Sequence, residues 1–409
     1  MPELLHQIHC EIMRGEGESR LYIDDAAERM EKLCAIMPGS VSLIYMDPPF
    51  RTGKEFEIKL RRPTGGQRSG EAEISLPAYS DKLTREEYFA LMRRVLEASK
   101  KLLTGDGMLF LHVDYREHAN LRLVADEIFG EENLINEIIW AYESGGRSKN
   151  FFARKHDIIL LYAATKEYDL HIEDAAALMA GDKKNHMARG VDEDGRSYRY
   201  ITSGGKTYRY YDDEPVPPSD VWTDISHLQQ RDPQRTGYET QKPLKLLDRI
   251  VKCASRPGDT VLDPFCGSGT TLEAAYLGGR QFIGIDLNPA VVEFVRKRTL
   301  GSGAKLYFSE SEGAPSISVE RVPGITFETV YLTDVQLDGL PEGLEISGID
   351  AIDSWAVGTV SDGVFTCLDE EVRTAKNPIL KGELHTEMYQ SALAVRISDI
   401  LGRRYFFSL

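Results

Sequence analysis

A predicted strand that ends in a glycine turn and leads into a helix is the feature that most limits how this chain can fold. It is the run Thr260-Val-Leu-Asp263-Pro-Phe265-Cys-Gly267-Ser-Gly269-Thr270-Thr271, and a second predicted strand ends at Gly284-Ile285-Asp286. Such a turn leaves room for a ligand against bare backbone, and an acid at the tip of the next strand can accept hydrogen bonds from ribose hydroxyls. The pattern predicts an α/β fold with a nucleoside-containing ligand at the carboxyl edge of a parallel sheet.

The charges in this turn indicate which ligand it takes. A dinucleotide-binding fingerprint would have a third glycine at position 272, where this chain has Leu272, so a pyrophosphate cradle is disfavoured. The Asp263 carboxylate repels phosphate but attracts the ammonium or sulfonium group of S-adenosylmethionine. The other interpretation is a glycine turn that serves only close packing of helix and strand, and the spacing of the two acids argues against it. We therefore predict an S-adenosylmethionine site.

The second informative run is Tyr45-Met46-Asp47-Pro48-Pro49-Phe50. An exocyclic aromatic amine is a poor nucleophile because its lone pair is delocalised into the ring. The Asp47 carboxylate and the Pro48 carbonyl can accept hydrogen bonds from both N–H groups and aim the nitrogen lone pair at a methyl donor. The prolines fix the turn, and Phe50 offers a face on which an extruded base can stack. The alternative is a Pro-Pro strand terminator followed by a core phenylalanine.

Together these runs resemble the beta class of amino-group DNA methyltransferases. The resemblance covers about residues 20–300 and includes Val221-Trp222-Thr-Asp224-Ile225 and Thr240-Gln241-Lys242-Pro243. It implies transfer of a methyl group from S-adenosylmethionine to the exocyclic amine of a base flipped from duplex DNA. Asp47 favours adenine N6, whereas Phe50 in place of the commoner tyrosine leaves cytosine N4 open. An RNA or protein amide methyltransferase and a non-catalytic binding module are the more remote alternatives.

The resemblance also implies a role for each matching residue. The target amine and base would be held by Asp47, Pro48, Pro49 and Phe50. The cofactor would be bound by Asp25, Lys242, Pro243, Asp263, Pro264, Phe265, Gly267, Ser268, Gly269, Thr270 and Asp286. Two positions depart from the family: Asp24 replaces the glycine that usually precedes Asp25, and Glu239 stands where a proline is common. No metal site is expected.

Predicted strands alternate with helices on both sides of these motifs. Strands are expected at 41–46, 108–113, 135–141, 157–162, 260–262 and 281–285, and helices at 84–103, 116–129, 243–254, 270–278 and 290–299. This alternation predicts a mostly parallel sheet with helices on both faces. The resemblance adds a methyltransferase-type, Rossmann-like sheet with a circularly permuted motif order.

Four segments are predicted along the chain. Residues 1–164 would form the catalytic part of the methyltransferase domain, 165–238 an inserted target-recognition domain, and 239–309 the cofactor-binding part. Residues 310–409 read as a small, strand-rich and acidic C-terminal module, with 17 Asp and Glu against 7 Lys and Arg. No chemical motif indicates what this module does.

The charge distribution qualifies the net charge of −16. The C-terminal module alone contributes −10, whereas residues 51–70 read as a basic loop and 183–211 as a basic stretch interleaved with tyrosines. Candidate DNA contacts are therefore Arg51, Lys54, Lys183, Lys184, Arg189, Arg196, Arg199, Lys206 and Arg209. The alternative for the second stretch is an exposed hairpin around Ser203-Gly204-Gly205 with ordinary cross-strand pairs. We expect both basic segments to face the duplex and the acidic module to face away.

The remaining expectations concern single residues and cellular context. His112 and Asp114 are expected to have core or hydrogen-bonding roles, and Cys266 to pack inside the cofactor turn. Five cysteines without a C-x-x-C pair, no export signal and no apolar membrane span suit a reducing cytoplasm. The family resemblance further implies double-stranded DNA as partner, a homodimer, and a possible partner restriction endonuclease.

Overall fold

The computed structural model describes most of the chain. The residues that it leaves undescribed are 1, 64–70, 143–147, 176–186, 230–231, 310, 312, 314, 341–345, 347, 375–376 and 388–391. Two candidate DNA contacts, Lys183 and Lys184, therefore lie outside the described residues. Among the described residues, no helix is long and apolar enough to cross a membrane.

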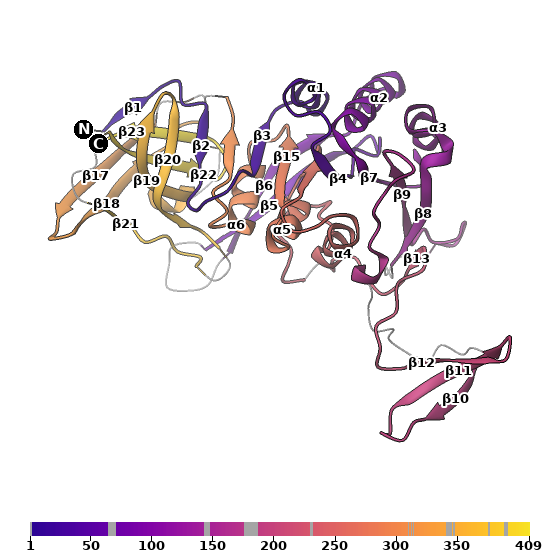
Figure 1. The fold of residues 1–409 in the computed structure, drawn as a ribbon. Coiled ribbons are helices and arrows are strands. Elements are labelled where there is room, and N and C mark those ends of the chain that lie inside the picture. Colours follow the sequence, from indigo (N-terminus) through magenta and orange to yellow (C-terminus); the bar gives the residue numbers. More distant parts are fainter. Residues whose placement is uncertain are drawn as a thin grey trace.

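A mostly parallel sheet forms the centre of the molecule (Figure 1). Neighbouring parallel strands run in the order β3 (Arg20–Ile23), β15 (Gln281–Asp286), β14 (Thr260–Asp263), β4 (Val41–Met46) and β7 (Leu103–Val113). Beyond β7 come antiparallel β9 (His156–Ala163), then β8 (Leu134–Ala141) and the short β13 (Val221–Trp222). Strand β14 thus lies directly beside β4, so the ends of the two predicted motifs meet at one edge of the sheet.

Helices cover both faces of this sheet, which confirms the predicted fold class. One face carries α1 (Ala26–Ile36), α2 (Arg85–Leu102) and α3 (His118–Phe129); the other carries α4 (Leu244–Ala254), α5 (Thr270–Leu277) and α6 (Val291–Arg298) (Figure 1). Strand β4 is apolar at most positions because it contributes to both layers. Its Ile44 and Met46 pack with α1 to α3, while Leu43 and Tyr45 pack in the other core.

The two strands after the Asp-Pro-Pro-Phe run pair with each other as a hairpin, so the predicted basic loop at 51–70 was wrong for residues 55–63. Residues 64–70 of that prediction lie outside the described residues. Strands β5 (Glu55–Pro63) and β6 (Glu71–Ser80) pair antiparallel over this region. Apolar Phe56, Ile58 and Leu60 alternate with charged residues, and this period of two favours a strand. Ile58 is fully buried and bridges to Tyr238, which docks the hairpin beside the glycine turn.

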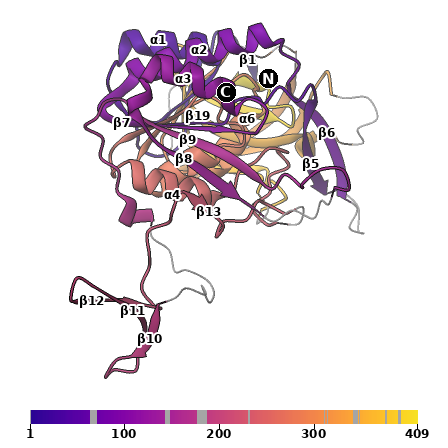
Figure 2. The ribbon, with the colours of Figure 1, turned by 90° about the vertical axis from the view of Figure 1, so that its right-hand side faces the viewer.

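The insert contains a separate three-stranded sheet set apart from the central one (Figures 1 and 2). It consists of β10 (Ala188–Val191), β11 (Ser197–Ser203) and β12 (Lys206–Tyr211). Gly204 and Gly205 both have positive φ, at 59° and 76°, as a two-residue hairpin turn requires. The hairpin around Ser203-Gly204-Gly205, the alternative given for the basic stretch, is therefore present.

The last hundred residues are rich in strands. A three-stranded sheet consists of β17 (Ser316–Pro323), β18 (Phe327–Gln336) and β21 (Glu383–Glu387). The other strands, β19 (Ile352–Ser361), β20 (Val364–Val372), β22 (Leu393–Asp399) and β23 (Arg404–Ser408), join the central sheet through β2 (Cys10–Ile12) and β16 (Lys305–Tyr307). The N-terminal β1 (Glu3–Leu5) pairs with β23, so the first residues also contribute here. Short 3-10 helices lie at η1 (Glu131–Asn133), η2 (Ile172–Ala175) and η3 (Gly348–Ala351).

Buried charges join this C-terminal region to the central domain. Arg296 on α6 donates to Glu11 on β2 at 2.9 Å and to Glu370 on β20 at 3.1 Å. Arg396 on β22 contacts the same two carboxylates, at 3.1 Å and 3.3 Å. Both arginine side chains are completely buried. Because unpaired buried charges are costly, the network fixes the two parts against each other.

Candidate active site

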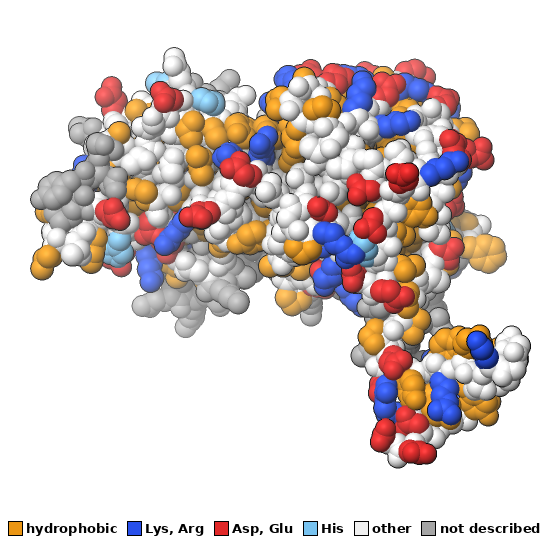
Figure 3. Space-filling view, in the orientation of Figure 1, with side chains coloured by type: hydrophobic (Ala, Val, Ile, Leu, Met, Phe, Trp, Pro, Cys, Tyr) orange, Lys and Arg blue, Asp and Glu red, His pale blue; other side chains and the backbone are white. Residues whose placement is uncertain are grey.

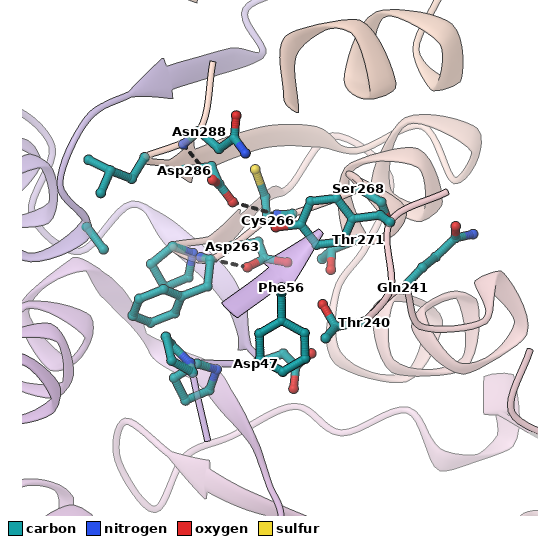
Figure 4. Close-up of a pocket in the computed structure, with 18 of the residues that line it drawn as sticks. Asp47, Phe56, Thr240, Gln241, Asp263, Cys266, Ser268, Thr271, Asp286 and Asn288 are labelled. Atoms are coloured by element: carbon teal, nitrogen blue, oxygen red, sulfur yellow. Dashed lines mark hydrogen bonds between the residues drawn. The ribbon is translucent and has the colours of Figure 1, made fainter. Parts of the chain in front are cut away.

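A cavity of about 740 Å³ opens at the carboxyl ends of β4, β14 and β15 (Figure 4). Asp47 follows β4, Asp263 ends β14 and Asp286 ends β15, so three neighbouring parallel strands each bring one carboxylate to the cavity. Figure 4 shows Asp286 and Asn288 toward one end and Asp47 toward the other, with Asp263 between them. Ligands in open α/β sheets bind at this edge.

The glycine turn is fixed by the acids around it. Gly267 N donates to the Asp286 carboxylate at 2.9 Å, and Phe265 N donates to Asp263 at 3.0 Å. Gly269, at φ 76°, precedes α5 in a left-handed conformation. A Cβ atom at this position would lie 2.8 Å from the Val295 side chain. Close packing of α5 on α6 therefore also requires a glycine here.

Burial weakens the two strand-end acids, Asp263 and Asp286, as acids. Burial raises the pKa of Asp263 to about 7, with the charges of Asp47 and Asp286 adding to the effect. Burial likewise raises the pKa of Asp286 to about 6, although backbone N–H groups oppose the shift. When these buried carboxylates are ionised, they favour a cation or hydroxyl donors as ligands. The ammonium, sulfonium and ribose of S-adenosylmethionine fit these requirements.

Asp47 presents one bonded and one free carboxylate oxygen. Its Oδ2 atom accepts a hydrogen bond from Lys242 Nζ. Its Oδ1 atom is buried and has no hydrogen-bond partner among the described residues. Pro48, Pro49 and Phe50 line the same cavity, and Lys242 Nζ lies 5.5 Å from the Phe50 ring centroid. An unpartnered acceptor beside an aromatic face suits a planar ligand that carries an N–H donor.

Residues 41–297, more than half of the chain, match the DNA methylase family of N6 and N4 type. The chain belongs to this family. S-adenosylmethionine is the cofactor of this family.

Several individual proteins are similar to this chain in sequence or in structure. The type II methyltransferase M.EcaI of Enterobacter cloacae is 32% identical over 302 residues, which cover 63% of this chain and 64% of M.EcaI. The chain thus matches less than two thirds of M.EcaI. The DNA adenine methyltransferase YhdJ of Escherichia coli (strain K12) is 27% identical over 295 residues, covering 71% of this chain and 85% of YhdJ. The structure of a DNA modification methylase from Thermus thermophilus, complexed with S-adenosyl-L-methionine, is 19% identical, with a TM-score of 0.44 over 72% of this chain and 100% of that one.

Most of the predicted cofactor-binding residues line the cavity, but Asp25, Lys242, Pro243 and Gly269 differ from the expected role or position. Asp25 lines it and also caps α1 through a bond from Glu28 N at 3.0 Å. The Lys242 side chain bonds to Asp47. Pro243 precedes α4 and, like Gly269, is not among the lining residues. The other predicted lining residues are Asp263, Pro264, Phe265, Gly267, Ser268, Thr270 and Asp286.

His112 lies in a buried hydrogen-bonded chain behind Phe50. Its Nδ1 atom is 2.9 Å from the Tyr45 hydroxyl, and its Nε2 atom is 3.2 Å from Asp157. The hydrogen-bonding role expected for His112 is therefore confirmed. Cys266 is buried in the cavity wall, and burial raises the pKa of its thiol well above the usual value. A packing role suits a thiol that stays protonated.

Several of the predicted DNA-contacting arginines form ion pairs with acidic residues of the same chain. Arg51 donates to Glu117 at 3.0 Å. Arg196 pairs with Asp213 at 2.8 Å, and Arg199 with Asp212 at 3.0 Å. Figure 3 shows acidic and basic side chains interspersed over the insert. The insert is therefore less basic as a surface than the count of its bases suggested.

Other lining residues were missed by the sequence reasoning. Tyr238, Thr240, Asn288 and Leu401 all line the cavity. Thr240 belongs to the quoted Thr-Gln-Lys-Pro run, so its neighbours gave a usable signal. Leu401 gave none, because nothing in the local sequence links the C-terminal region to the cofactor turn.

Proposed function

We propose that this chain transfers a methyl group from S-adenosylmethionine to the exocyclic amine of a base flipped out of duplex DNA, with adenine N6 as the target. The unpartnered, buried Oδ1 of Asp47 in the cavity that holds Asp263 and Asp286 carries this proposal. Asp at this motif position supports adenine. Phe50 in place of tyrosine leaves cytosine N4 open as the second candidate.

The proposed chemistry needs positioning above all. Asp47 Oδ1 and the Pro48 carbonyl accept the two N–H groups of the target, and Phe50 stacks on its ring. The cofactor supplies an electrophilic methyl group on its sulfonium. Alignment of the amine lone pair with that methyl group allows a direct in-line transfer: the N–CH3 bond forms as the S–CH3 bond breaks, the neutral thioether leaves, and the nitrogen then loses one proton to solvent. The Asp47 carboxylate also stabilises the positive charge that develops on the attacking nitrogen.

Lys242, predicted as a cofactor ligand, is better placed to hold Asp47. We expect Lys242→Met to lower kcat by about 10²-fold, because Asp47 loses the partner that fixes its orientation. The dissociation constant for S-adenosylmethionine should change far less. Stopped assays at saturating cofactor, together with calorimetry, measure the two effects separately.

Lys245→Met is the matched control for this variant. Lys245 lies in the first turn of α4, is largely exposed and pairs with Asp224 at 3.6 Å. The Lys245→Met substitution should leave kcat and cofactor binding unchanged. If Lys242→Met instead weakened cofactor binding while kcat at saturation stayed at the wild-type value, Lys242 would be a cofactor ligand as first predicted.

Cofactor affinity should rise with pH. Because burial raises the pKa of Asp263 to about 7 and that of Asp286 to about 6, both are largely protonated in mild acid. The cationic cofactor favours ionised Asp263, so binding releases a proton and strengthens by up to about tenfold per pH unit below pH ~7, then levels off. These folded-state pKa values exceed the unfolded ones, so the unliganded protein should lose stability as pH rises through the same range.

Calorimetry across a pH series tests this expectation. Asp263→Asn cannot ionise and should flatten the pH dependence while weakening binding throughout. Affinity that is flat or falls between mild acid and neutrality in the wild-type protein would contradict the assignment.

Duplex DNA is proposed as the substrate, approached by the β5–β6 hairpin and the insert. A cytoplasmic location, a homodimer and a partner restriction endonuclease remain predictions from the family resemblance. Transfer of labelled methyl groups to duplex DNA, with single-stranded DNA and RNA as competitors, tests the substrate class. We expect only duplex DNA to compete efficiently; stronger competition by RNA would exclude the proposal.

A further inference from the structure

The C-terminal module contributes Leu401 to the lining of the cavity. Leu401, in the turn between β22 and β23, lines the cavity together with Pro289 and Ala290, which follow Asp286. At the next residue, Gly402, the backbone is in direct contact with this loop. A Cβ atom there would lie 2.5 Å from Ala290 Cα and 2.7 Å from the Pro289 carbonyl carbon. The close approach and the φ of 78° both require glycine.

Hydrogen bonds hold this turn in one conformation. The buried carboxylate of Asp399 accepts from Leu401 N and Arg403 N, both at 2.9 Å, and from Arg403 Nε at 2.6 Å. Gly402 N donates back to the Asp399 carbonyl at 3.0 Å. A turn fixed by its own carboxylate presents Leu401 on a rigid backbone, which is the arrangement expected of a binding wall.

The turn is also fixed relative to the rest of the cavity. Ile400 packs in the same hydrophobic core as Val291 and Val295 of α6. The buried pairs of Arg296 and Arg396 with Glu11 and Glu370 lock β20 and β22 against α6 and β2. The position of Leu401 therefore follows from the packing of the whole module.

We propose that Leu401 is part of the S-adenosylmethionine site and packs against the nucleoside end of the cofactor. The inference rests on the proposed roles of Asp47 and Asp286. Figure 4 shows Asp286 and Asn288 away from Asp47. Pro289 and Ala290 follow Asn288 and contact Gly402, the neighbour of Leu401. The ribose and base of the cofactor would therefore lie toward Leu401 and its methyl group toward the target amine. The side chains of Pro289, Ala290 and Leu401 give this end an apolar wall, which suits the face of an adenine ring. The acidic C-terminal module thus contributes to cofactor affinity through Leu401.

Calorimetry on the full-length chain tests the proposal with two ligands. Leu401→Ala should weaken S-adenosylmethionine binding about tenfold, the effect of removing one buried leucine contact. It should weaken 5′-methylthioadenosine, which keeps the nucleoside but lacks the amino acid, by a similar factor. Gly402→Ala should act in the same direction, because its methyl group pushes the turn off Ala290. KM for the cofactor should rise while kcat at saturation stays near the wild-type value.

Leu384→Ala is the matched control within the module. Leu384 lies on β21, is buried in the module's own core and does not line the cavity. Its loss should lower the melting temperature but leave cofactor affinity unchanged. Three results would overturn the proposal: unchanged affinity in folded Leu401→Ala, a loss confined to S-adenosylmethionine, or an equal loss in Leu384→Ala. If the wild-type chain itself bound no S-adenosylmethionine, the proposed function would fail instead.

Discussion

Asp47→Ala is expected to reduce methyl transfer to DNA by about 10²–10³-fold or more, because the target amine loses the acceptor that orients it and stabilises its developing charge. Cofactor binding should stay within the same order of magnitude, because Asp263, Asp286 and the glycine turn are untouched. Asp47→Asn keeps an acceptor oxygen but not the charge. It should therefore fall between the alanine variant and the wild type.

Single-turnover assays with cofactor bound separate this effect from binding. In such assays the burst of methylated DNA should disappear in Asp47→Ala, while calorimetry still shows bound S-adenosylmethionine. Glu239→Ala is a suitable control, because this carboxylate is 40% exposed and pairs only loosely with Lys59, at 3.5 Å. If Asp47→Ala transferred methyl groups at the wild-type rate, Asp47 would have no role in the reaction.

Arg296→Met should destabilise the protein by about 3–5 kcal/mol, the largest stability effect that we expect. The substitution leaves Glu11 and Glu370 with one fewer cation in a site where both carboxylates are buried. Part of their remaining charge is balanced by Arg396. The loss should appear as a lower midpoint of urea denaturation.

Arg14→Met is the matched control, because Arg14 also joins the two parts of the chain. It pairs with Asp369 at 2.9 Å, but its side chain is 60% exposed. Exposed pairs contribute about 0–1 kcal/mol. If both variants lost the same small amount of stability, the buried network would not be what fixes the C-terminal module to the central domain.

The sequence allowed the site's main carboxylates to be predicted together. Asp47, Asp263 and Asp286 each follow a short apolar run, and parallel strands place such residues at one edge. The bond between Lys242 and Asp47 was not predictable in the same way. It joins residues 195 positions apart and depends on where α4 begins relative to β4.

Counts of charged residues predicted less of the structure than the apolar patterns did. The acids of the C-terminal segment give it a net charge of −10, yet Glu370 is buried and pairs with Arg296 and Arg396. In residues 51–70, the number of basic residues suggested a loop, whereas the alternation of Phe56 and Ile58 with charged residues predicts a strand. Leu401 reaches the cofactor cavity only through the packing of an entire module, which local patterns do not encode.

Identification of the methylated nucleoside tests the central claim most directly. Duplex DNA would be incubated with the wild-type chain and S-adenosylmethionine, digested to nucleosides and examined by mass spectrometry beside an Asp47→Ala reaction. We expect N6-methyldeoxyadenosine in the wild-type reaction and at least about 10²-fold less of it with Asp47→Ala; N4-methyldeoxycytidine would change the base but keep the mechanism. Methylation on a ring carbon, or no methylated nucleoside from a protein that binds the cofactor, would contradict the proposed function.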